Sequence, residues 1–246
     1  MTTYRVGVDI GGTFTDIVLL GSDSTIHTKK ISSSVENYAQ AIVAGLTEVF
    51  QESGLDGRVI EEIRHGTTVA ANAILEHKGA RVGLITTKGF RDVLEIRTLR
   101  MPRLCDMTWM KPEPLVERYL RRVVDERIDA NGRVERALDP RDAERQVDAL
   151  LAEGVETIAV CLLNSFTNPA HELAIKEIIR DKAPDIPLSI SFEVLPEIKE
   201  YERTSTTVVN AYVMPIVATY LRALRKGLDD ALIPARLLLK IGRAHV

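Results

Sequence analysis

Apolar and polar residues along the first part of the chain follow the pattern of short strands and then a helix. Tyr4 to Val8 and Ile17 to Leu20 predict two buried strands, and Thr25 to Ile31 predicts a third after a polar turn. From Tyr38 to Phe50 the apolar side chains recur at helical spacing, and Gly54 marks the end of that helix. The chain therefore begins with meandering strands followed by a helix.

Helices and strands alternate through the next part of the chain. The pattern predicts a strand that ends at His65, a helix from about Thr68 to Lys78, a strand from Arg81 to Thr86 and a helix around Arg91 to Ile96. This order resembles the ribonuclease-H-like order of the actin, heat-shock ATPase and sugar-kinase superfamily. The resemblance implies an α/β fold with a mixed sheet flanked by helices. It assigns residues 1–96 to one half-domain with a phosphate loop.

The rest of the chain divides into an irregular segment and a second α/β portion. Prolines interrupt residues 97–138, so we interpret this segment as an insertion, and Asn131-Gly132 predicts a hairpin turn inside it. Residues 139–240 return to alternating helices and strands. Thr157 to Leu163 is a nearly continuous apolar strand typical of a parallel sheet, and a long helix is expected from about Pro196.

Composition indicates an ordinary globular protein of 246 residues, 45% hydrophobic and 27% charged. A net charge of -3 gives no general attraction to nucleic acid. No apolar run approaches the length of a membrane span, and the N-terminus lacks a signal peptide, so we expect a cytoplasmic protein that does not bind membranes. Cys105 and Cys161 are far apart and form no C-x-x-C motif, which argues against a disulfide scaffold or a zinc site.

The turn between the first two predicted strands has the composition of a phosphate-binding loop. Gly11 and Gly12 permit positive φ and close approach of the backbone to an anion. Hydroxyl donors and metal-binding oxygens come from the residues around them, Asp9, Thr13, Thr15 and Asp16. The plain alternative is a glycine hairpin turn in which Asp9 is a local cap. A P-loop or a dinucleotide fingerprint fits less well, because a strand rather than a helix follows this turn.

A second polar turn, Gly66-Thr67-Thr68, lies between a predicted strand and a predicted helix. Its N–H groups and hydroxyls would make an anion-binding helix start, although Thr67 is alternatively a simple N-cap. His65 could donate to a phosphate or a substrate, or it could bond a neighbouring backbone carbonyl and shape the turn. Because ligands gather outside strand ends in such sheets, we expect this turn and the Asp9 to Asp16 loop at the same edge of one sheet.

Longer motifs occur at His65 to Ala73, Thr86 to Asp92, Glu193 to Ile198 and Glu200 to Tyr212. They resemble the hydantoinase A and 5-oxoprolinase family, whose members are ATP-dependent enzymes that open cyclic amides such as hydantoins and 5-oxoproline. Related ketone carboxylase subunits use the same machinery. The resemblance implies transfer of the γ-phosphoryl group of ATP to a carbonyl or enol oxygen, followed by hydrolysis or carboxylation. It also implies a hydantoinase B-like partner subunit or fused domain.

On this resemblance, the expected site has catalytic, phosphate-binding and substrate-side residues. Asp9 and His65 are the expected catalytic residues, and Asp9 would hold Mg²⁺ through water. The phosphates of ATP are expected to contact Gly11, Gly12, Thr13, Thr15, Asp16, Gly66, Thr67 and Thr68. Tyr201, Glu202 and Arg203 are expected on the substrate side, although a solvated helix face explains this polar run equally well.

The C-terminus departs from the family pattern, because members of the family are much longer and carry a second phosphate motif. Ile241 to Val246 resembles the translation of a sequencing-library adapter, so residues 241–246 are expected to be a non-native tail. Two further functions stay open. A non-catalytic nucleotide-binding or assembly domain would not need the set Asp9, Thr13 and Asp16, and a sugar kinase does not account for the motifs around His65.

Overall fold

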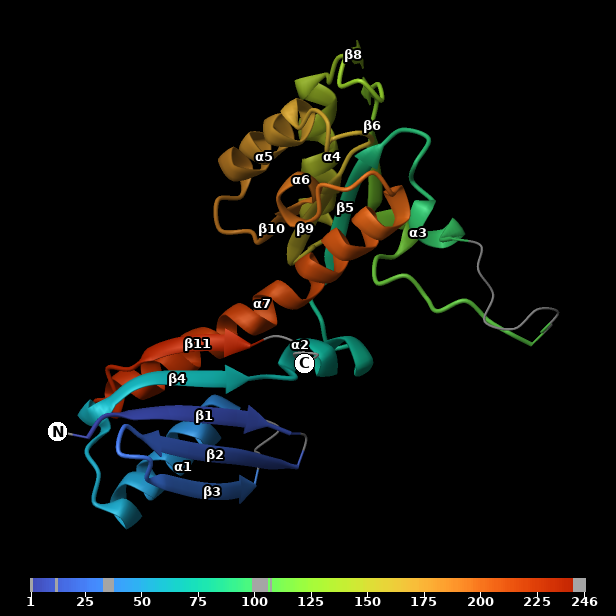
Figure 1. Ribbon diagram of the computed structural model, residues 1–246. Coiled ribbons are helices and arrows are strands. Elements are labelled where there is room, and N and C mark those ends of the chain that lie inside the picture. Colours follow the sequence, from blue (N-terminus) through green and yellow to red (C-terminus); the bar gives the residue numbers. More distant parts are fainter. Residues whose placement is uncertain (1, 12, 33–37, 99–105, 107, 241–246) are drawn as a thin grey trace. The chain divides into compact units, whose positions relative to one another are not determined.

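The computed structural model describes residues 2–11, 13–32, 38–98, 106 and 108–240 (Figure 1). Its contacts divide the chain into two compact units. The first unit consists of Met1–Lys78 and Ile216–Val246, and the second unit of Gly79–Pro215. The expected ranges 1–96, 97–138 and 139–240 do not coincide with these units. The expected tail, 241–246, lies outside the described residues.

The first unit is built on a five-stranded mixed sheet in the order β11-β4-β1-β2-β3. The strands are β1 (Tyr4–Ile10), β2 (Phe14–Gly21), β3 (Ile26–Ser32), β4 (Ile60–Gly66) and β11 (Arg236–Lys240). The first three form an antiparallel meander, and β4 and β11 run parallel to β1. The expected α/β fold with a mixed sheet is therefore confirmed.

One face of this sheet packs against α1 (Tyr38–Ser53) and the C-terminal part of α7 (Glu200–Asp230). Strand alternation places every second residue of β1 in the core, while α1 and α7 supply the helical side of the same cluster. The fully buried contributors include Val6, Ile17, Leu19, Ile42, Leu46, Leu224 and Leu228. Each buried apolar side chain of this size stabilises the fold by about 1.5–3 kcal/mol. The remaining residues of β1 and β2 therefore lie on an exposed face.

One expected strand belongs to another sheet. The apolar run after Gly79 forms β5 (Val82–Thr87), which pairs with strands of the second unit. The edge position beside β4 is taken by β11, much later in the chain. Both strands pair with parallel neighbours, and a continuously buried strand such as β5 has no alternation that could identify its sheet.

The second unit contains a four-stranded sheet in the order β10-β9-β5-β6, with all pairs parallel. Its other strands are β6 (Arg121–Val124), β9 (Thr157–Cys161) and β10 (Leu188–Ile190). Helices α4 (Pro140–Ala152) and α5 (Ala170–Lys182) pack beside one another in this unit. Asp139 caps α4 by accepting a 3.0 Å hydrogen bond from the Arg141 amide, with Pro140 in the first turn.

Short elements complete the structure. Asn131-Gly132 turns the chain between β7 (Arg127–Ile128) and β8 (Val134–Arg136), so the expected hairpin is confirmed. The short helices are α2 (Val69–Leu75), α3 (Val93–Ile96), α6 (Ser191–Val194) and the 3-10 turns η1 (Gly57–Val59) and η2 (Arg118–Leu120). Strand β10 ends at Ile190, because α6 begins at Ser191.

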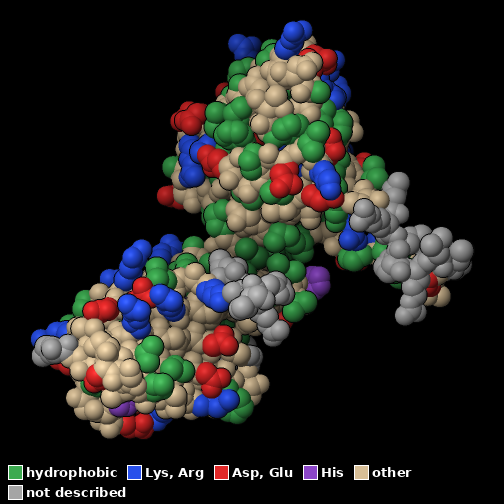
Figure 2. Space-filling model, viewed as in Figure 1, with side chains coloured by type: hydrophobic (Ala, Val, Ile, Leu, Met, Phe, Trp, Pro, Cys, Tyr) green, Lys and Arg blue, Asp and Glu red, His purple; other side chains and the backbone are tan. Residues whose placement is uncertain are grey.

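Helix α7 is, among the described residues, the one helix long and apolar enough by length and composition to cross a membrane. Core packing explains this composition equally well. Thr207 and Ala211 are buried in the second unit, and Leu224 and Leu228 are buried in the first. Acidic and basic side chains are interspersed on the visible surface of both units (Figure 2).

Candidate functional site

The two polar turns of the first unit meet at one edge of its sheet. Asp9 pairs with Asp16 across the antiparallel β1 and β2, and with Gly66 across the parallel β1 and β4. A Cβ atom added to Gly66 would lie 3.1 Å from Oδ1 of Asp9, so the absence of a side chain at Gly66 leaves room for the Asp9 carboxylate. The expected proximity of the Asp9 to Asp16 loop and the Gly66 turn is confirmed.

Charged side chains form a row across the exposed face at this edge. Directly opposed residues share a face, and the register Gly66, Asp9, Asp16, Lys30 runs through β4, β1, β2 and β3. Lys30 Nζ lies 3.4 Å from Oδ1 of Asp16 and 5.3 Å from the centre of the Phe14 ring. Sequence analysis missed Lys30, although the meander register would have placed it opposite Asp16.

The β1–β2 turn closes more tightly than expected. The Gly11 amide donates a 2.9 Å hydrogen bond to the Phe14 carbonyl, so this N–H group is used by the hairpin and does not point at an anion. A Cβ atom at Gly11 would approach the same carbonyl to 3.0 Å, which explains the glycine. Thr13 is exposed at the turn, and Gly12 lies outside the described residues.

Thr15 was expected to contact phosphate, and its position contradicts this. Its side chain is 0% exposed and lies on the core face of β2, opposite to the face that carries Asp9 and Asp16. Side chains alternate between the two faces of a strand, so a residue next to Asp16 cannot share its face. Thr15 is therefore a core residue.

The turn after β4 holds its two threonine hydroxyls in local hydrogen bonds. Thr67 Oγ1 accepts a 3.2 Å bond from the Val69 amide, and the Thr68 hydroxyl donates to the Ile10 carbonyl at 3.4 Å. The second bond joins the end of β1 to the start of α2. Helix α2 ends at Leu75 instead of Lys78, so it has only about two turns and a correspondingly small dipole for an anion.

The sequence left two roles open for His65, donation to a ligand or a bond to a neighbouring backbone carbonyl. The structure shows the bond to a backbone carbonyl. The His65 side chain is 0% exposed, Nδ1 lies 3.3 Å from the Val8 carbonyl, and Nε2 bonds the Tyr220 hydroxyl. Nδ1–H donates to the carbonyl, so Nε2 accepts from Tyr220. Burial lowers the pKa of His65, which favours this neutral form. Both ring nitrogens are occupied, and the expected catalytic role of His65 is not supported by this geometry.

Tyr201, Glu202 and Arg203 belong to the second unit and do not form one substrate-facing surface. The Tyr201 hydroxyl accepts a 3.1 Å bond from Nε of Arg97, and Glu202 is half-buried. Arg203 is 1% exposed and donates to Ser165 Oγ at 2.5 Å and to the Leu162 carbonyl at 2.8 Å. Arg203 therefore fixes the loop after β9, which contradicts its expected place on the substrate side.

The carboxyl end of the second sheet is filled by the protein's own polar side chains. Buried Glu172 accepts hydrogen bonds from the Leu162 and Phe192 amides and from Ser191, and burial raises the pKa of its carboxyl group. Nearby, His171 Nδ1 donates to buried Glu126 at 2.7 Å. These carboxylates are thus held in hydrogen bonds within the protein, while Nε of Arg203, at the same edge, is buried without a partner among the described residues.

The edge around Asp9 fits a magnesium ion bound beside phosphates. Mg²⁺ uses one or two carboxylates, with water and phosphate oxygens completing its octahedral shell. Asp9 is exposed, and a second carboxylate, Asp16, stands opposite it. Among the described residues there is no cluster of three or more His, Cys, Asp or Glu side chains that would enclose a metal by itself. This donor set fits Mg²⁺ that is shared with a phosphate ligand.

Comparison with known proteins gives consistent matches. Residues 5–183 match the family described as the hydantoinase/oxoprolinase N-terminal region. The crystal structure of ATP-dependent caprolactamase from Pseudomonas jessenii is 34% identical, with a TM-score of 0.88 and coverage of 97% of this chain and 35% of that chain.

Two further relatives are an acetophenone carboxylase gamma subunit and a 5-oxoprolinase. The gamma subunit from Aromatoleum aromaticum is 35% identical over 92% of this chain and 34% of its own length. The 5-oxoprolinase 1 of Arabidopsis thaliana is 32% identical over 93% of this chain and 20% of its own length. The chain thus spans about one third or less of the relatives it matches.

Proposed function

Because the chain belongs to the hydantoinase/oxoprolinase family, we propose that it is the phosphate-binding N-terminal part of an ATP-dependent enzyme that opens cyclic amides. The observation that carries this proposal is the placement of Asp9 beside Gly66 at one sheet edge, where two polar turns meet. Exposed carboxylates at that edge suit a magnesium-bound nucleotide. ATP use is supported by the caprolactamase relative, which is named as ATP-dependent.

The proposed reaction activates the amide by phosphorylation. An amide oxygen is a weak nucleophile, so the enzyme must hold it in line with the γ-phosphorus and neutralise charge on the leaving ADP. Asp9 would hold Mg²⁺ through water, and Mg²⁺ would supply that charge neutralisation. The Thr13 hydroxyl, Gly12 and the Gly66 to Thr68 turn would orient the phosphates. Asp16 would complete the acidic side of this edge.

We propose cyclic amides as the substrate class because caprolactamase and 5-oxoprolinase are both named for such compounds. Ketone carboxylation is the second candidate, and the acetophenone carboxylase relative favours it. Both reactions begin with phosphorylation of an oxygen atom, so the edge around Asp9 serves either. The choice depends on residues that contact the substrate.

A partner is part of the proposal. The acetophenone carboxylase relative is a gamma subunit, which supports action together with a hydantoinase B-like subunit or fused domain. The cytoplasm is the proposed location, and a net charge of -3 supports a small-molecule substrate rather than nucleic acid.

The test is a turnover assay on the complete enzyme with its partner subunit. We expect ADP release that depends on a hydantoin, 5-oxoproline or caprolactam, together with the ring-opened acid as product. ADP release that depends on a ketone and bicarbonate would select carboxylation instead. ATP binding without turnover on any of these compounds would select the non-catalytic domain, and ring opening without ATP would overturn the proposal.

A further inference from the structure

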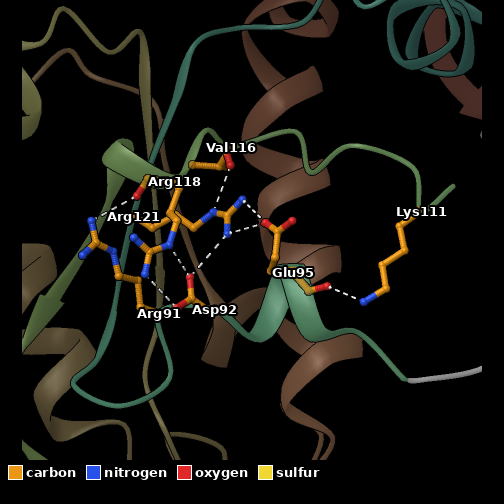
Figure 3. Close-up of polar contacts among 7 residues, drawn as sticks. All are labelled: Arg91, Asp92, Glu95, Lys111, Val116, Arg118 and Arg121. Atoms are coloured by element: carbon orange, nitrogen blue, oxygen red, sulfur yellow. Dashed lines mark hydrogen bonds and ion pairs between the residues drawn. The ribbon is translucent and has the colours of Figure 1, made fainter.

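A group of arginines lines a hollow of about 480 Å³ in the second unit, within a part of the structure that the proposed function does not use. Arg91 lies just before α3, while Arg118 belongs to η2 and Arg121 begins β6 (Figure 3). Pro114 and Tyr119 supply apolar wall. The Tyr119 hydroxyl accepts a 2.8 Å bond from Arg81, which holds this ring in place.

Arg121 is the buried member of the group. Its side chain is 2% exposed, and both terminal nitrogens lie 3.1 Å from a single oxygen, Oε2 of Glu95. Glu95 itself is 56% exposed. A guanidinium group can bind a carboxylate through two parallel hydrogen bonds, whereas the two terminal nitrogens of Arg121 share one oxygen of an exposed side chain. Its Nε donates to the Val116 carbonyl at 3.0 Å, and Nη1 lies 3.9 Å from Oδ1 of Asp92. Glu95 therefore occupies the position that an external anion could take.

The other two arginines leave donor capacity at the same hollow. Arg118 binds both oxygens of Asp92 at 2.9 and 3.0 Å, which lowers the pKa of Asp92 and keeps it ionised. Arg91 donates one bond, at 3.3 Å, to the Arg118 carbonyl. Nε of Arg91 is buried and has no partner among the described residues. An unpaired buried donor costs free energy, which a bound acceptor would recover.

We propose that this hollow binds a small organic molecule through an oxyanion group, a carboxylate or a phosphate, that contacts Arg91 and Arg121 and displaces Glu95. Arg118 binds the carboxylate of Asp92 and Arg121 binds that of Glu95, whereas Arg91 has no ion pair among the described residues. Glu113 and Glu117 also line the hollow, so recognition depends on direct contact with the guanidinium groups rather than on long-range attraction. The apolar wall favours an anion with an apolar body.

The test is titration of the full chain with benzoate and, separately, with inorganic phosphate, followed by NMR of the arginine Nε–H groups. The signals of Arg91 and Arg121 are expected to shift, which separates this hollow from phosphate bound in the first unit. A response to benzoate alone identifies the anion as a carboxylate, and a response to phosphate alone identifies it as a phosphate. Absence of any shift with either probe overturns the proposal.

Matched variants measure the contribution of each group. Arg91→Gln is expected to weaken binding about tenfold, or about 1.4 kcal/mol, and Glu95→Gln is expected to strengthen it. Arg118→Gln provides a second loss variant at a side chain that is 61% exposed, where misfolding is not expected. Arg141→Gln, an exposed arginine outside the hollow, is the control. Equal affinity in the wild type, Arg91→Gln and Arg118→Gln would overturn the proposal.

Discussion

Asp9 and Asp16 stand directly opposite one another on β1 and β2, with both side chains on the exposed face of the first sheet. Like charges in this position repel and destabilise a sheet. Lys30 pairs with Asp16 at 3.4 Å, while Asp9 has no ion pair among the described residues. Asp9 is therefore the carboxylate of this pair that remains available for another cation.

Replacement of Asp9 by Asn in the complete enzyme should lower kcat for ATP-dependent ring opening by on the order of 100-fold or more. The reason is that Mg²⁺ would lose the carboxylate that positions it when charge develops on the phosphates. Stability should change little, because an exposed carboxylate facing Asp16 is replaced by a neutral group of the same shape. Steady-state kinetics and thermal unfolding measure the two effects.

Asp16→Asn is the matched control for Asp9→Asn, since it removes the opposed carboxylate from the same face. Its effect on kcat should be much smaller, because Lys30 already neutralises Asp16. Normal kcat in Asp9→Asn would remove Asp9 from the proposed metal site. Gross unfolding of Asp9→Asn would instead favour a structural role for Asp9.

Replacement of Lys30 by Gln should weaken ATP binding about fivefold, equal to about 1 kcal/mol. Without Lys30, the Asp16 carboxylate is uncompensated next to the proposed phosphate position. An exposed ion pair contributes at most about 1 kcal/mol to folding, so the melting temperature should hardly change. The double variant Lys30→Gln with Asp16→Asn should recover part of the affinity, and calorimetry with ATP would show whether the two effects are coupled. Additive losses would contradict this explanation.

The strand order of the meander followed from local pattern, because hairpin register depends on neighbours in the sequence. The mixed sheet was implied by the family resemblance, and the proximity of the two turns followed from the rule that ligands gather outside strand ends. The sequence pattern did not predict that β5 pairs in the second sheet or that β11 pairs with β4, because parallel pairing joins segments that are far apart in the sequence. Strand alternation could have excluded Thr15 and included Lys30. The partners of His65 could not be predicted, because Tyr220 comes from α7, far along the chain.

Stability of the first unit should fall as the solution is acidified, and His65 should be responsible for part of the loss. Burial lowers the pKa of His65 in the folded state, whereas the unfolded chain has the ordinary value of about 6.5. Above about pH 6.5 both states are neutral and the full stability is present. As the pH falls below that value, the unfolded state binds the proton first, and stability is lost until the folded pKa is passed.

This pH dependence can be assigned by comparing variants between about pH 7.5 and about pH 5. His65→Gln should be less stable at neutral pH, because the Val8 and Tyr220 bonds are disturbed, and its melting temperature should depend less on pH. His77→Asn is the control, since His77 is exposed with φ of 52° and Asn tolerates that conformation. An unchanged pH slope in His65→Gln would show that other groups control acid stability.

Gly79→Ala should strongly destabilise the second unit. A Cβ atom at Gly79 would overlap the ring of Tyr212, which is 6% exposed and cannot move without disturbing its core. Overpacking of this kind costs about 1–3 kcal/mol or more. Urea unfolding of Gly79→Ala, Tyr212→Ala and the double variant tests the contact. The losses should be less than additive, because the second change removes the clash.

Arg203→Met should destabilise the second unit by about 2 kcal/mol without a specific effect on catalysis. The change removes the hydrogen bonds that Arg203 donates to the Leu162 carbonyl and to Ser165 Oγ. These two buried acceptors then lose the guanidinium donor. Met has similar length and no charge, so packing around α7 is largely kept. Thr206→Ala, at an exposed position on the same helix, is the control and should be close to neutral.

Native-state hydrogen exchange would measure the stability of the second unit in Arg203→Met, and ring-opening kinetics in the complete enzyme would measure function. A large rise in KM with unchanged exchange protection would instead show that Arg203 contacts the substrate.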